Sequence, residues 1–182
     1  MLRKRYGEDI AIERKLLTEN ISNSVNGFEG ELDDLNFIEY LQNEAIYDRE
    51  SRTYVYIDNS NGKIVAFASL SCSTLILGDE DVQSYAPAIL LDKFVVDSNY
   101  RHLAYSALTG AMTLSDVILM DIIDYSESIA ESVIGAKYIV LYSTPEAFHF
   151  YQKHVELRRF DSDMIPSCDP RIADCIPMYM LI

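Results

Sequence analysis

The sequence predicts an α+β fold with a mixed sheet, and two observations carry this prediction. Strand-like residues 53–58 and 63–70 flank the turn sequence NSNG at residues 59–62, and an Asn-Gly pair between two such runs is typical of an antiparallel hairpin. Farther along, the apolar residues 89–96 and the β-branched or aromatic residues 136–142 are separated by a helical region. A strand–helix–strand unit of this kind implies a parallel pair with a right-handed crossover.

Two helices are expected before the hairpin. Apolar residues between positions 12 and 17 fall on one helical face, and a polar, turn-rich stretch follows over residues 19–30. Apolar residues then recur with a period near 3.6 over residues 35–45, directly after two aspartates.

The most informative segment is an apolar strand that runs through a tight turn towards a helix. A polar connection that reaches Pro87 precedes it, residues 98–102 form the turn, and residues 103–108 have the pattern of a helix start. Backbone N–H groups converge where a buried strand enters a helix in this way, and such a cluster suits an anion, especially a phosphate. By itself this pattern does not fix a function.

The C-terminal half continues the alternation of helix and strand. Helical composition extends to residue 134, with an interruption expected near residues 124–126. Thr144 is a suitable N-cap for the next helix, with a proline and a glutamate behind it. Residues 176–182 form a last strand, whose proline favours an edge or a strand start.

Composition places the chain as one domain, residues 1–182, of a cytoplasmic protein. The 182 residues include 15 basic and 29 acidic ones, a net charge of −14 that repels nucleic acid at long range and attracts amines; solubility alone explains it equally well. No apolar stretch approaches the ~20 residues of a membrane span, and no apolar signal segment follows the basic start. The 3 cysteines are odd in number and poorly spaced for zinc, which favours reduced thiols and no metal.

Short motifs follow one another in a characteristic order along residues 28–160. They are LDDL at 32–35 with Phe37 and Ile38, RTYV at 52–55, GKIVAF at 62–67, Val96-Asp97, IGAK at 134–137, Ala147, and Phe150-Tyr151. Their order and spacing resemble the GNAT superfamily of acyl-CoA-dependent N-acetyltransferases, most closely the branch that contains the toxins acetylating aminoacyl-tRNA. The resemblance implies a mostly antiparallel sheet with a central parallel strand pair and helices on both faces.

The same resemblance assigns residues to an acetyl-CoA site. The strand around Phe94 would pair with the pantetheine amides, the N–H groups after Arg101 would hold the pyrophosphate, and Arg101 would add a positive charge. Tyr151 would be the general acid, since tyrosine phenols are ordinarily protonated at neutral pH and can protonate the departing thiolate. The implied donor-binding residues are Phe94, Val95, Val96, Arg101, His102, Leu103, Ala104, Tyr105 and Ser106.

The chain departs from the family pattern at the phosphate loop. The family motif is Q/R-x-x-G-x-G/A, and the matching positions are Arg101, Ala104 and Ser106, so neither glycine is present. Those glycines let the backbone approach phosphate closely. Two functions therefore stay open: transfer of an acetyl group from acetyl-CoA to a primary amine, and a catalytically degenerate domain that serves as a binding or regulatory module.

The general base and the acceptor are not fixed by the sequence. Asp92 and Tyr100 are the candidates for a base that reaches an amine through water, and a solvated strand end is the alternative for Asp92. The acceptor amine belongs to a small molecule, a peptide or an aminoacyl-tRNA; net charge disfavours the tRNA, and no membrane partner is expected. The only candidate tRNA footprint is Lys153, Arg158 and Arg159, with Arg49 and Arg52 as further members. A homodimer is left open.

Overall fold

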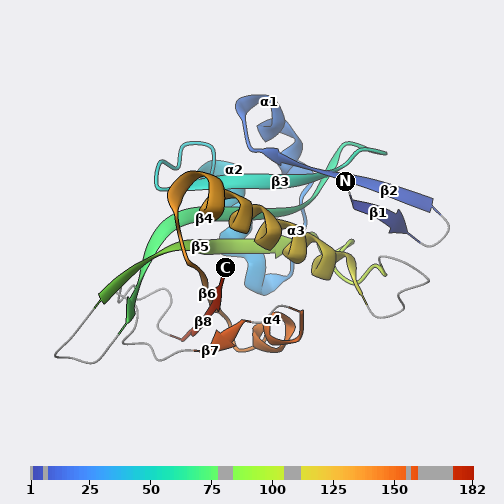
Figure 1. Cartoon of the computed structure of the whole chain (residues 1–182). Coiled ribbons are helices and arrows are strands. Elements are labelled where there is room, and N and C mark those ends of the chain that lie inside the picture. Colours follow the sequence, from blue (N-terminus) through green and yellow to red (C-terminus); the bar gives the residue numbers. More distant parts are fainter. Residues whose placement is uncertain (1, 6–7, 78–83, 105–111, 155–156, 160–173) are drawn as a thin grey trace. The chain divides into compact units, whose positions relative to one another are not determined.

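The computed structural model describes residues 2–5, 8–77, 84–104, 112–154, 157–159 and 174–182 (Figure 1). The chain forms two compact units. The first contains Met1–Ser69 and Lys93–Asp121, and the second contains Leu70–Asp92 and Ile122–Ile182. Strands β4 and β5 and helix α3 contribute residues to both units. The single domain expected from the sequence stays a prediction.

The first unit contains four neighbouring antiparallel strands. These are β1 (Leu2–Arg5), β2 (Glu8–Leu16), β3 (Ser51–Asp58) and the first part of β4 (Lys63–Leu77). The predicted hairpin between β3 and β4 is confirmed. Gly62 ends its turn with a φ of 72°, a left-handed conformation that favours glycine.

The predicted first helix is wrong, because residues 8–16 form strand β2. Ile12 and Leu16 are four positions apart in the sequence, a spacing that places two residues on one face of a strand as well as on one face of a helix. Antiparallel pairing with β3 decides between the two: Ile12 lies opposite Asp58, and Leu16 lies opposite Tyr54. The short α1 (Glu19–Ser22) and the 3-10 turn η1 (Asn23–Gly27) follow in the stretch expected to be turn-rich.

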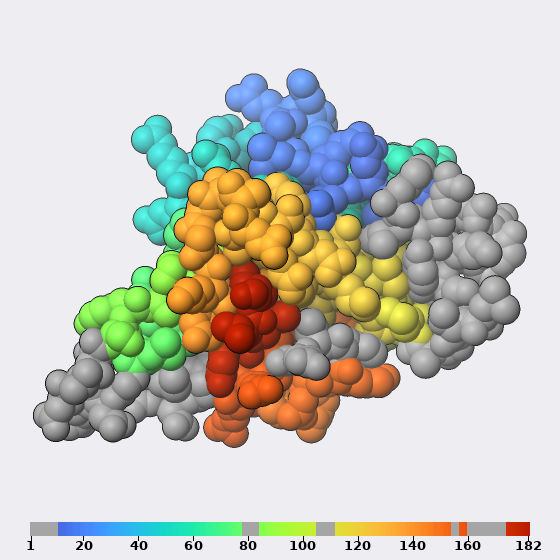
Figure 2. All heavy atoms as spheres, viewed as in Figure 1, coloured from blue at the N-terminus to red at the C-terminus, as the bar shows by residue number. Residues whose placement is uncertain are grey.

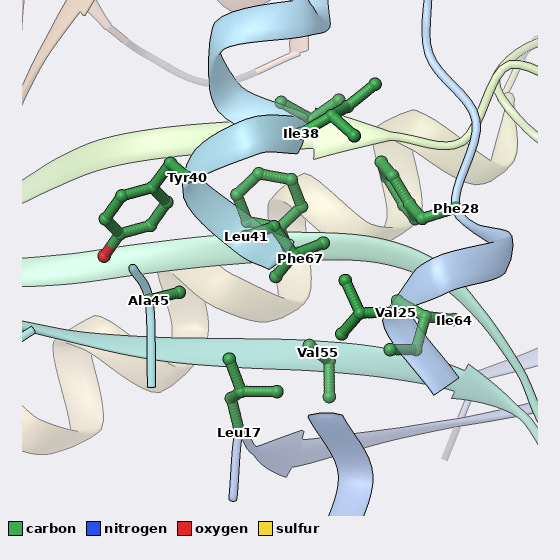
Figure 3. Packing of buried hydrophobic residues seen from close by; sticks show 11 residues of the cluster. Leu17, Val25, Phe28, Ile38, Tyr40, Leu41, Ala45, Val55, Ile64 and Phe67 are labelled. Carbon is green, nitrogen blue, oxygen red and sulfur yellow. The ribbon is translucent and has the colours of Figure 1, made fainter. Parts of the chain in front are cut away.

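Helix α2 (Leu35–Asn43) confirms the second predicted helix and covers one face of the sheet, behind the strands in Figure 1. Figure 3 shows the buried side chains of this helix, Ile38, Tyr40 and Leu41, in one cluster with Phe67 of β4. Phe67 also packs edge-on against Phe28, with ring centroids 5.6 Å apart. The cluster consists of Leu17, Val25, Phe28, Ile38, Tyr40, Leu41, Ala45, Val55, Ile64, Phe67 and Val95.

The first half of α3 (Leu114–Ile129) covers the opposite face. Successive side chains of a strand point to opposite faces, and Tyr56 follows Val55 of the α2 cluster. The Tyr56 hydroxyl donates to the Asp121 carboxylate (2.9 Å), which also pairs with Arg14. Burial and the Asp121 charge raise the pKa of Tyr56, so this phenol stays a donor. Helices therefore lie on both faces of the sheet, as expected.

The second unit contains the parallel pair. Strand β5 (Ser84–Val96) pairs with β6 (Tyr138–Ser143) in parallel, from Ala88 opposite Tyr138 to Leu91 opposite Leu141. Strand β8 (Ile176–Leu181) pairs antiparallel with β6 and with the two-residue β7 (Arg158–Arg159). The mixed, mostly antiparallel α+β fold is thus confirmed. Pro177 stands near the start of β8, one of the two expected places.

The connections differ from the expectation in two places. Strand β4 continues to Leu77 and β5 already begins at Ser84, so strand replaces much of the expected polar connection. Helix α3 also runs unbroken through residues 124–126, and the Ser126 hydroxyl donates to the carbonyl of Ile122 (2.7 Å) within the helix. The irregularity comes later, in the π-turn η3 (Ala130–Ile134), which lies at the surface in orange in Figure 2.

The last predicted helix is confirmed as α4 (Phe148–His154). The Thr144 side chain accepts the N–H of Ala147 (3.3 Å), as expected of an N-cap. Among the described residues, no helix is long and apolar enough to cross a membrane.

Candidate functional site

The predicted donor-binding strand is the last part of β5. Val95 and Val96 are buried, and Phe94 is half-buried. The last parallel pair with β6 is at Leu91, and β5 continues beyond it to Val96. The Asp97 N–H then bonds to the carbonyl of Val65 in β4 (2.9 Å). This places the Phe94–Val96 backbone in a fixed, extended conformation.

Asp97 organises the turn that follows. The residue is only 3% exposed. One carboxylate oxygen accepts the N–H of Glu29 (2.9 Å), and the other accepts the N–H of Asn99 (2.9 Å). Its carbonyl accepts the N–H groups of Tyr100 (2.8 Å) and Arg101 (2.9 Å). The turn is therefore fixed from within and also tied to residue 29.

Tyr100 is a second tie between this turn and the β3–β4 hairpin. Its buried hydroxyl donates to the Asp58 carboxylate (3.3 Å) and accepts from the Asn61 side chain (3.1 Å). Because the Tyr100 phenol donates to a buried carboxylate, it is directed into the fold, and Tyr100 is a poor candidate for the general base. Asp92 is exposed on β5, as the solvated alternative predicted.

Arg101 is paired with two carboxylates. One guanidinium nitrogen donates to the Asp34 carboxylate, and the other lies 3.2 Å from Glu31 Oε2. The guanidinium also approaches the carbonyl of Val96 (3.4 Å). Sequence reasoning missed both partners. The signal for them was the acidic capping box formed by Glu31 and Asp34 at the 3-10 turn η2 (Leu32–Asp34).

The predicted helix start after the turn is wrong for the residues that the structure describes. The Leu103 N–H bonds to the Tyr100 carbonyl (3.1 Å), the Leu103 carbonyl accepts the N–H of Leu114 (2.8 Å), and Ala104 bridges to Thr113. The backbone of Leu103 and Ala104 thus pairs with residues 113 and 114 and does not form a helical turn. His102 is exposed at the end of the turn. Tyr105 and Ser106 lie outside the described residues.

Helix α3 begins later, at Leu114, and the chain's own acid caps its N-terminus. The Asp116 carboxylate accepts the N–H of Thr113 (2.6 Å), and the Asp116 N–H points to the Thr113 hydroxyl (3.3 Å). Asp116 is buried. A carboxylate thus already occupies the position where a helix N-terminus attracts an anion.

Tyr151 lies in the second unit, on α4. It is 9% exposed, and its ring packs edge-on against Phe150 with centroids 5.3 Å apart. Its N–H bonds to the carbonyl of Ala147 (3.2 Å), which holds it in the first turns of the helix. The candidate basic residues of this unit, Lys153, Arg158 and Arg159, are all exposed.

Two of the three cysteines lie in the described part of the chain. Cys72 is exposed and Cys175 is half-buried; both are free thiols. Burial and the charge of Asp174 raise the pKa of the Cys175 thiol. Cys168 lies outside the described residues. Within the described part of the chain, no group of three or more His, Cys, Asp or Glu side chains is placed to hold a metal ion.

The mixed sheet with its parallel pair and the helices on both faces agree with the fold that the GNAT resemblance implies. No family model and no curated protein matches the chain. Among solved structures, a bacterial toxin is similar with a TM-score of 0.70 and 13% identity, over 95% of this chain and 92% of that one. The toxin AtaT complexed with acetyl-methionyl-tRNAfMet is similar with a TM-score of 0.65 and 12% identity, over 92% of this chain and 94% of that one. A KacTA–DNA complex is similar with a TM-score of 0.67 and 11% identity, over 94% of this chain and 93% of that one.

Proposed function

We propose that this protein is an N-acetyltransferase that transfers an acetyl group from acetyl-CoA to a primary amine. The observation that carries the proposal is the similarity in fold, over more than nine-tenths of both chains, to a bacterial toxin and to AtaT in complex with acetyl-methionyl-tRNAfMet. One of these similar structures, AtaTR, is bound with acetyl-CoA. At 11–13% identity this similarity is one of fold.

The chain's own residues supply three of the tasks that the reaction needs. The extended backbone at Phe94–Val96 binds the pantetheine amides. Arg101, in the turn that Asp97 fixes, adds a positive charge at the phosphates once a carboxylate partner gives way. Tyr151 donates its phenolic proton to the thiolate that leaves when the amine attacks the thioester carbonyl. Acetyl-CoA supplies the activated acyl group.

The acceptor that we propose is a cationic small-molecule or peptide amine. A net charge of −14 attracts such amines and repels polyanions. The competing acceptor, an aminoacyl-tRNA, is favoured by the AtaT complex and by the exposed Lys153, Arg158 and Arg159. This basic set is small beside the several phosphate contacts that nucleic-acid binding normally uses.

A second candidate function is a non-catalytic domain that binds a partner or senses an acyl-CoA. Two observations favour it. Arg101 is already paired with Asp34 and Glu31, and the Asp116 carboxylate caps the N-terminus of α3. Both features compete with a bound phosphate, and the family's glycines are absent.

The test is transfer of labelled acetyl groups from acetyl-CoA to three acceptor classes: polyamines, basic peptides and bulk charged tRNA at physiological salt. We expect labelling of a polyamine or peptide. Labelling of charged tRNA instead would overturn the charge argument but keep the acetyltransferase. If none of the three is labelled, the non-catalytic function is the better one.

Tyr151→Phe tests the general acid in the same assay. Loss of a positioned proton donor should lower turnover ~100-fold, with acetyl-CoA binding nearly unchanged. Tyr47→Phe is the matched control, because Tyr47 is exposed in the other unit. Equal rates for both variants would make Tyr151 a packing residue.

A further inference from the structure

The ion pairs of Arg101 are placed where a phosphate would need the same guanidinium. Its side chain is 25% exposed and carries contacts on both terminal nitrogens. Arginine binds carboxylates and phosphates through the same planar fork of N–H donors. A phosphate can therefore reach this fork fully only by replacing one of the carboxylates.

The two carboxylates differ in how firmly they are held. Asp34 is 15% exposed, and its carboxylate also accepts the N–H of Glu31 (3.0 Å). The backbone around it is tightly packed, since a Cβ added at Gly30 would lie 2.8 Å from Asp34 Cβ. Glu31 is 57% exposed and approaches Arg101 at 3.2 Å. Asp34 is thus the fixed partner, and Glu31 is the partner that can leave.

We propose that Glu31 is a displaceable counter-ion of the donor site, which a phosphate-bearing donor exchanges for one of its own phosphate oxygens at Arg101. This inference rests on the proposed function, because it assumes that the donor's phosphates lie at the turn after β5. Glu31 then sets how strongly the site favours CoA over a thiol that lacks phosphates.

Two opposing effects act on the exchange in the wild type. The phosphate gains the hydrogen bonds that Glu31 gives up, but the displaced carboxylate stays near and repels the new anion. Glutamine at this position keeps the size of the side chain and the backbone carbonyl that accepts the Asp34 N–H (3.0 Å), and it removes the charge. The substitution Glu31→Gln should therefore release Arg101 for phosphate without loss of the local fold.

The test is calorimetric titration of the full chain with two probes, CoA and pantetheine, which lacks the phosphates. Since an exposed ion pair contributes up to ~1 kcal/mol, we expect Glu31→Gln to bind CoA about fivefold more tightly. Its affinity for pantetheine should stay that of the wild type. Glu39→Gln, an exposed glutamate on α2, removes the same charge and should change neither affinity more than about twofold.

The outcomes separate this inference from the proposed function. If wild type binds CoA and Glu31→Gln gains no more than Glu39→Gln, the inference is overturned and the proposed function stands. An equal gain for pantetheine also overturns it, because the effect then lies elsewhere than at the phosphates. If neither wild type nor Glu31→Gln binds CoA, the inference and the proposed function are both wrong.

Discussion

Replacing Asp97 by alanine removes the acceptor on which the turn after β5 depends. The N–H groups of Glu29 and Asn99, each 2.9 Å from a carboxylate oxygen, would lose their partner at a residue that is 3% exposed. An uncompensated buried donor costs ~1–3 kcal/mol. Because these two bonds are only partly buried, we expect a loss of about 2–4 kcal/mol in the free energy of unfolding.

Urea unfolding of the full chain measures this loss. Asp97→Asn keeps the shape and one acceptor oxygen, so its loss should fall between those of wild type and Asp97→Ala. Asp124→Ala is the control: Asp124 is exposed on α3, and its removal should change stability by less than about 0.5 kcal/mol. If Asp97→Ala unfolds at the same urea concentration as Asp124→Ala, Asp97 does not hold the turn.

Two further predictions concern stability. Burial alone raises the pKa of Asp48, but hydrogen bonds from Ser51, Tyr40 and Glu50 outweigh it and lower the pKa from 3.8 to about 2. A lowered folded-state pKa contributes stability that is present above the ordinary value and is lost as pH falls from about 4 to about 2. In Asp48→Asn the stability lost over this pH window should be smaller than in wild type, by less than about 1 kcal/mol because solvent screens the charge. Urea midpoints measured across the window give this difference. Equal losses of stability in variant and wild type would contradict the assignment. Phe67→Ala should cost about 3–5 kcal/mol in the same unfolding assay, since Phe67 is fully buried against Phe28, and a loss below about 1 kcal/mol would contradict the packing described.

Elements defined by local signals could be predicted from the sequence. The hairpin follows from the turn sequence NSNG, because the left-handed conformation at Gly62 is a property of the turn itself. The helix at α2 follows from its apolar period, and the cap at Thr144 follows from residue type. Each of these signals lies within a few residues of the structure that it produces.

Elements that depend on distant pairing partners could not be predicted from the sequence. The spacing of Ile12 and Leu16 fits both a helix and a strand, and pairing with β3 some 40 residues away decides the outcome. The small and apolar residues after His102 fit a helix, yet Ala104 bridges to Thr113 instead. Arg101 could be singled out by the family resemblance, but its partner Asp34 is 67 residues earlier in the chain.

An acetyl-CoA site in this fold is tested most directly by thermal unfolding and calorimetric titration of the full chain with acetyl-CoA. A ligand that binds the native state alone stabilises it by ~2.7 kcal/mol at a hundredfold excess over its dissociation constant. We predict saturable heat with one site per chain and a melting temperature that rises with ligand concentration. Absence of heat together with an unchanged melting temperature at millimolar acetyl-CoA would contradict the proposed acetyltransferase.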